Sequence, residues 1–407
     1  MKKPDLYHFN PTCEYAVANG NPSWQPNQLL QKMEDDLETL PLFFAKVEDY
    51  LLLKNNPSDE YLHSLRKLGI TVPNFITQKN AFVDNKFLSL PLNKLIPWGW
   101  SPVVHKLFSP LKSNCSRNFL DSPVSNWKPE HKNLFSKGFA RSIQKIITSE
   151  YPTERFLSDK LLTQICTSRE EIEILLNRWG KLMVKAPWSS SGRGLQAITK
   201  SPIHQKVREK LLGFVNEQGY VIVEPFLNKV LDLGFLFELK NGKISYLGTS
   251  NFSTNKKGQY QGNYLNGLPD NLNKEIISFA KFIPGKIIQP LIKTIEASDL
   301  AKYYEGNFGI DTLIFLDENS ELKINPCLEI NVRQSMGLLS LNLEKLILPR
   351  EKGMFKIFYQ PGLSFFQFKS EMEKKYPLLI SGNQIKSGFF ALSESTKNTS
   401  FGAYLLV

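Results

Sequence analysis

From Tyr151 onward the chain alternates short apolar runs with amphipathic stretches, and this alternation restricts the fold more than any other feature. The runs at 181–187 (KLMVKAP) and 220–225 (YVIVEP) predict buried strands, because each is short, apolar and ended by a proline. Helical periodicity predicts helices over 168–180 and 204–219. Strands that alternate with helices indicate a mixture of α/β and α+β layers.

Helix termini can be located from local signals. Ser168 with Glu171 three residues later forms a capping box, and Gly180 ends the same helix. Ser158 and Asp159 resemble a helix cap, which predicts a further helix with Lys160 in its first turn.

Two hairpins follow, over 231–248 and 309–331. Asn241-Gly242 predicts the turn of the first, and residues 318–320 the turn of the second. Asp311 then falls opposite residues 327–329, where its carboxylate can meet that of Glu329 across the ladder. Strand periodicity puts Asn331 and Arg333 on the face of Glu329.

Two carboxylates and an amide at one end of a sheet offer the hard oxygen ligands that Mg²⁺ prefers. The alternative is that Asp311 and Glu329 face solvent and Arg333 forms an ordinary salt bridge. Asp317 and Glu321 are further candidates for the first metal position.

The first 150 residues are less regular. A helical stretch is expected over 28–53 with a break at Pro41. The polar segment 109–129 predicts a long surface loop. Trp98 and Trp100 are expected to serve in packing.

Charge and composition exclude several classes of protein. Among 407 residues, 50 Lys and Arg against 39 Asp and Glu leave a net charge of +11, but no basic run exceeds two residues. We therefore expect a small anionic substrate or a nucleotide, and no nucleic-acid partner. No segment resembles a membrane span or a signal peptide, so a cytoplasmic protein without a membrane partner is expected. The four cysteines form no C-x-x-C pair and are expected to pack inside a reduced protein.

A serine- and glycine-rich loop follows the strand that carries Lys185. Backbone N–H groups, hydroxyls and a lysine in such a loop can bind phosphate oxygens, although a flexible connector has the same composition. The loop consists of Ser189, Ser190, Ser191, Gly192, Arg193 and Gly194. A short linker between two strands is expected to consist of Glu224, Pro225, Phe226 and Leu227. Its backbone groups could bind an adenine, and Asp232 could bind the ribose. The alternative is a strand end that binds no ligand.

In order and spacing, these motifs resemble the ATP-grasp superfamily, which binds ATP between two α+β subdomains. The resemblance spans about residues 151–345 and rests on Asp159-Lys160, VKAP, SSSGRG, VEPFL and G-I-D…L-E-I-N-V-R. It implies that Lys160 and Lys185 contact the ATP phosphates and that the loop 189–194 closes over them. It further implies that Glu224, Pro225, Phe226 and Leu227 hold the adenine, Asp232 the ribose, and Asp311, Glu329 and Asn331 the Mg²⁺.

The same resemblance divides the chain into four segments: a substrate-side, pre-ATP-grasp-like α/β domain over 1–150, subdomains over 151–222 and 223–345, and a closing extension over 346–407. It implies an ATP- and Mg²⁺-dependent ligase that phosphorylates a small carboxylate and joins it to an amine, a short peptide or another nucleophile. Lys185 and Arg333 would be catalytic, Arg333 by stabilising the acyl phosphate. A small-molecule kinase and a non-catalytic nucleotide-binding protein are the alternatives, and a homodimer is left open.

Overall fold

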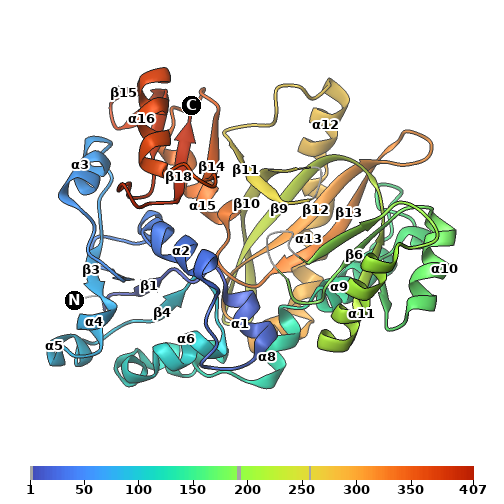
Figure 1. Cartoon of the computed structure of the whole chain (residues 1–407), viewed down its shortest axis with the longest axis horizontal. Helices are drawn as coiled ribbons and strands as arrows, with labels where there is room; N and C mark the ends of the chain where they lie inside the picture. Colours follow the sequence, from blue (N-terminus) through green and yellow to red (C-terminus); the bar gives the residue numbers. More distant parts are fainter. Residues whose placement is uncertain (1–2, 190–193, 256–257) are drawn as a thin grey trace. The chain divides into compact units, whose positions relative to one another are not determined.

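The computed structural model describes residues 3–189, 194–255 and 258–407 (Figure 1). Ser190, Ser191, Gly192 and Arg193 of the predicted phosphate loop therefore lie outside the described residues. Contacts group the chain into two units. The first comprises residues 1–127, 261–268 and 333–407, and the second comprises 128–260 and 269–332. The four segments expected from the sequence stay a prediction.

The N-terminal part of the first unit is built on a parallel sheet in the order β3-β2-β1-β4. Its strands are β1 Leu6–His8, β2 Tyr50–Leu53, β3 Asn74–Thr77 and β4 Leu95–Pro97. Parallel neighbours need crossover connections, and these contain most of the helices. The helices are α1 Cys13–Asn19, α2 Gln28–Leu37, η1 Leu40–Phe43, α3 Asp59–Lys67, α4 Gln78–Ala81, α5 Asn85–Leu88 and α6 Pro102–Leu107.

Two expectations for this region are wrong. Residues 50–53 form the strand β2 instead of continuing a helix. The stretch 109–129 is no surface loop, because short helices with buried apolar residues such as Leu111 and Phe119 run through it. These helices are η2 Ser109–Asn114, α7 Arg117–Leu120 and η3 Pro123–Ser125. Their turns are too short to show a helical period in the sequence.

The C-terminal part of the first unit adds antiparallel strands in the order β11-β14-β18-β17. The elements are β11 Tyr260–Leu265, α15 Met336–Leu343, η5 Glu344–Leu346, β14 Gly353–Tyr359, α16 Phe365–Lys375, β15 Leu379–Ser381, β16 Gln384–Ser387, β17 Phe389–Ala391 and β18 Phe401–Leu406. One apolar core joins this part to the N-terminal sheet, since Leu51, Trp98, Leu339 and Leu405 belong to the same cluster. Trp98 and Trp100 are both buried, as expected.

The second unit contains a small antiparallel sheet in the order β5-β8-β6-β7, with α10 and α11 packed against it. The capping box of Ser168 and Glu171 and the terminal Gly180 are confirmed. The helix expected after Asp159 is wrong: a single 3-10 turn is followed at once by a strand. The elements are η4 Asp159–Leu161, β5 Gln164–Cys166, α10 Arg169–Trp179, β6 Leu182–Lys185, β7 Leu195–Ile198, α11 Gln205–Gln218 and β8 Val221–Pro225.

Both expected hairpins form the other sheet of this unit, in the order β13-β12-β9-β10 (Figure 1). Asn241 and Gly242 take φ values of 50° and 71°, as a two-residue turn between twisted strands requires. The strands are β9 Asn228–Lys240, β10 Lys243–Thr254, β12 Gly306–Leu316 and β13 Leu322–Asn331. The remaining helices are α8 Pro129–Leu134, α9 Lys137–Glu150, α12 Lys274–Phe282, α13 Pro284–Glu296 and α14 Asp299–Tyr303.

All four cysteines are buried and form no disulfide, as expected. Burial raises the pKa of Cys115 to about 11 and that of Cys166 to about 12, so both remain thiols near neutral pH. Within the described residues, no helix combines the length and the apolar character needed to cross a membrane.

Glu34 makes the stability of the first unit depend on pH. Burial raises the pKa of its carboxyl to about 7, although Thr12 partly opposes this by donating to Oε1 from its hydroxyl at 2.6 Å. The folded protein therefore binds a proton at Glu34 more tightly than the unfolded chain does. The resulting contribution to the free energy of unfolding is complete at pH 4 and is lost as pH rises through 7. We expect Glu34→Gln to flatten the fall of melting temperature between pH 5 and pH 8. An unchanged pH profile in the variant would contradict this.

Candidate functional site

The second hairpin places the two predicted metal carboxylates opposite each other. Asp311 on β12 pairs with Glu329 on β13, and Gly309 pairs with Asn331, so both carboxylates and the amide share one face of the sheet. This confirms the expected register. Asp317 and Glu321 lie instead at the turn, where the Asp317 carboxylate accepts backbone N–H groups and Glu321 pairs with a lysine.

A register shift in β13 decides which residue Asp311 faces. Continuing the pairing of Leu316 with Leu322 would put Asp311 opposite Cys327, but a shift of two residues after Asn325 brings Glu329 there. Pro326 lies in the shifted segment and has no N–H to donate to the ladder. Bulges of this kind re-aim side chains and are frequent beside functional sites.

The surroundings of Asp311 are polar and close-fitting. The side-chain amide of Asn331 donates to Asp311 Oδ2 at 3.0 Å. On the other side, Asp311 pairs with Gly234 of β9, and a Cβ at Gly234 would lie 2.8 Å from Ser250 Oγ and 3.6 Å from Asp311 Oδ1. Glycine therefore leaves room beside this carboxylate.

A lysine that belongs to none of the sequence motifs binds the second carboxylate. Lys137, the first residue of α9, is buried, and its Nζ lies 2.7 Å from Glu329 Oε1. The same ammonium donates to the backbone oxygen of Ser189 at 2.8 Å, and the backbone N–H of Lys137 donates to Pro187 O at 2.9 Å. Residue 137 thus connects Glu329 to the start of the serine-glycine loop.

Contacts within the chain fix both ends of that loop. The backbone N–H of Ala186 donates to Gly194 O at 2.9 Å, and the indole of Trp188 donates to Lys132 O at 2.8 Å. A Cβ on Gly194 would overlap the side chain of Ser189. The glycine is therefore required by the close approach of the two loop ends.

Lys185 and Glu224 form a buried ion pair on adjacent strands. Nζ of Lys185 lies 2.7 Å from Glu224 Oε2, with side-chain exposures of 8% and 9%. Lys185 ends β6, as expected, but the expected linker is shorter than the sequence suggests. Glu224 and Pro225 are the last residues of β8, and only Phe226, which is half exposed, and Leu227 connect it to β9.

Asp232, Lys160 and Arg333, the remaining predicted residues, each have surroundings of their own. Asp232 on β9 is buried and accepts from Lys229 Nζ at 2.8 Å and from Thr254 Oγ1 at 3.0 Å. Lys160 is exposed in the 3-10 turn. Arg333 belongs to the first unit, where its Nε donates to Glu14 Oε1 at 2.9 Å.

The donor set fits a hard cation better than a soft one. Among the residues that the structure describes, no three His, Cys, Asp or Glu side chains converge, so the site consists of two carboxylates and one amide. Cys327 lies nearby, but burial, aided by the negative charges of Asp311 and Glu329, raises the pKa of its thiol well above the usual range.

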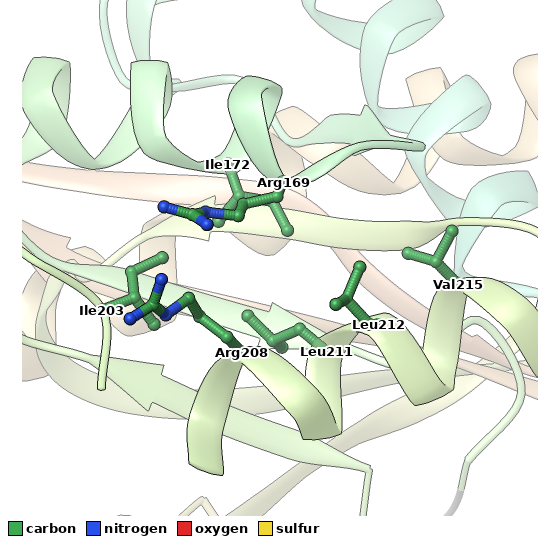
Figure 2. Close-up of a pocket in the computed structure, with 7 residues that line it drawn as sticks. All are labelled: Arg169, Ile172, Ile203, Arg208, Leu211, Leu212 and Val215. Atoms are coloured by element: carbon green, nitrogen blue, oxygen red, sulfur yellow. The ribbon is translucent and has the colours of Figure 1, made fainter. Parts of the chain in front are cut away.

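A small pocket elsewhere in the second unit contains none of these residues. It lies between α10 and α11, and its lining is aliphatic except for two arginines whose guanidinium groups lie toward the same end (Figure 2). The lining residues are Arg169, Ile172, Ile203, Arg208, Leu211, Leu212 and Val215.

Comparison with known proteins identifies the fold. No family model matches the chain, and no curated protein matches its sequence. Among solved structures, an N5-carboxyaminoimidazole ribonucleotide synthetase in complex with ADP matches with a TM-score of 0.51 and 9% identity, over 99% of this chain and 92% of its own. A biotin carboxylase from Campylobacter jejuni, solved as a beta-gamma-ATP complex, matches with a TM-score of 0.50 and 13% identity, over 100% and 87%. The ATP-grasp fold expected from the sequence is confirmed.

Proposed function

We propose that the chain is an ATP- and Mg²⁺-dependent ligase that activates a carboxylate as an acyl phosphate and joins it to an amine. The single observation that carries this proposal is the pairing of Asp311 with Glu329, with Asn331 on the same face of the sheet. Directly opposed carboxylates repel each other, and a divalent cation relieves this repulsion. The ammonium of Lys137, 2.7 Å from Glu329 Oε1, is consistent with this, because a positive charge already lies beside one of the two carboxylates.

The fold gives independent support for a nucleotide. Both matched structures are complexes with an adenine nucleotide, and both have the fold of this chain. Mg²⁺ bound to Asp311, Glu329 and Asn331 would neutralise charge on the phosphates during transfer. We infer that Lys160, Lys185 and the loop 189–194 bind those phosphates, that residues 224–227 hold the adenine and that Asp232 binds the ribose.

The proposed reaction has two steps. In the first, a carboxylate oxygen of the substrate forms a bond to the γ-phosphorus of ATP as the bond between that phosphorus and the ADP oxygen breaks. In the second, the amine nitrogen attacks the carbonyl carbon of the acyl phosphate, loses a proton and expels inorganic phosphate. Positioning and charge neutralisation are the main tasks of the protein in such transfers. We assign charge stabilisation of the acyl phosphate to Arg333, whose guanidinium is oriented by Glu14 at 2.9 Å.

Trapping with hydroxylamine tests this proposal without knowledge of the natural amine. The protein is incubated with ATP, Mg²⁺, hydroxylamine and a panel of small carboxylic acids and acidic peptides, and hydroxamate and ADP are measured. We expect equal amounts of both products with the accepted acid. A stable phosphorylated product without hydroxamate would instead establish the kinase, and tight ATP binding without any turnover would support the non-catalytic alternative.

A further inference from the structure

Lys137 occupies a position that is unfavourable for a cation unless it has an anionic partner. The amino end of a helix carries a partial positive charge, and Lys137 is the first residue of the 14-residue helix α9. Its side chain is 6% exposed, so the ammonium has lost most of its hydration. The carboxylate of Glu329, at 2.7 Å, and the carbonyl of Ser189, at 2.8 Å, offset these costs.

Glu329 is also the carboxylate that the proposed function assigns to the divalent cation. An ammonium in contact with Oε1 repels a second cation at the same carboxylate, and the burial of Lys137 limits the screening of this repulsion by water. If the divalent cation takes over Glu329, Lys137 loses this carboxylate as a counter-ion. A phosphate oxygen near the start of the loop at Ser189 would replace that counter-ion.

We propose that Lys137 is the resident counter-cation of Glu329 and makes divalent-cation binding depend on a polyphosphate. The inference rests on the proposed function and adds a coupling device to the same site. Lys137 acts through Glu329 and is therefore a positioning residue. Linkage requires the dependence to be mutual, so the cation also raises the affinity for the nucleotide.

Mn²⁺ binding measured by electron paramagnetic resonance tests the coupling directly. Free Mn²⁺ is titrated with wild-type protein, Lys137→Met and Lys137→Gln, each with and without ADP. Lys145→Met serves as the control, because it removes the same charge from an exposed position on the same helix. The glutamine variant keeps a polar group beside Ser189 if methionine prevents folding, and circular dichroism establishes the folded state of each.

We expect wild-type protein and Lys145→Met to bind Mn²⁺ at least about tenfold more tightly with ADP than without. Both Lys137 variants should bind Mn²⁺ alone about tenfold more tightly than wild type, and ADP should then strengthen Mn²⁺ binding less than it does in wild type. Folded Lys137 variants with wild-type Mn²⁺ affinity in both conditions would overturn the inference while leaving the proposed function in place. If ADP does not promote Mn²⁺ binding even in wild type, the proposed metal site fails and the inference fails with it.

Discussion

Glu329→Gln is expected to abolish the Mg²⁺ dependence of ADP binding and to lower acyl-phosphate formation by at least about a hundredfold. The substitution keeps the size of the side chain but removes the negative charge that opposes Asp311 across the hairpin. Binding of ADP without Mg²⁺ should be retained or strengthened, because Lys137 then lacks its carboxylate partner and can pair with phosphate. Calorimetric titration with ADP, with and without Mg²⁺, measures both effects.

Glu321→Gln is the matched control for this experiment. It removes the same charge from the same hairpin, but Glu321 lies at the turn, with 59% of its side chain exposed and Lys323 at 2.7 Å. We expect wild-type binding from it. Loss of Mg²⁺ dependence in both variants would attribute the effect to net charge instead of to the site.

Lys185→Met is expected to destabilise the second unit by about 3 to 5 kcal/mol and to weaken nucleotide binding. The large effect on stability follows from burial: the substitution leaves the carboxylate of Glu224 without the ammonium that lies 2.7 Å from it, and both side chains are more than nine-tenths buried. An apolar replacement of both partners removes the uncompensated charge. Lys185→Met with Glu224→Leu should therefore recover most of the stability but none of the nucleotide binding.

Chemical denaturation of the two single variants and the double variant measures this cycle. Arg169→Met provides the comparison within the same unit, because Arg169 and Glu173 form a partly exposed pair on one helix. Such pairs contribute about 0.3 to 0.5 kcal/mol. A double variant as unstable as the worse single variant would contradict the assignment of the loss to an unpaired buried charge.

The sequence predicts those parts of the fold and of the site that depend on local signals. The turn at Asn241-Gly242, the capping box at Ser168 and the hairpin that pairs Asp311 with Glu329 all follow from residues close together in the chain. The turn signal alone placed Asp311 opposite residues 327–329. The shift around Pro326 selects Glu329, and no period in the sequence shows such a shift.

Long-range contacts could not be predicted in the same way. Lys137 lies 192 positions before Glu329, and a lysine near the start of a helix usually faces solvent. The one available signal was its unfavourable charge at a helix amino end. Short turns were the other source of error: the 3-10 turn after Ser158 and the helices over 109–125 are shorter than the window in which a helical period can be recognised.

Anomalous diffraction from crystals grown with Mn²⁺ and ADP is the most direct measurement of the central idea. We expect one manganese peak coordinated by the carboxylates of Asp311 and Glu329, and the ADP phosphates beside Lys185 and the loop that starts at Ser189. Manganese bound elsewhere, or ADP bound away from that loop, would contradict the proposed site and the ligase function built on it.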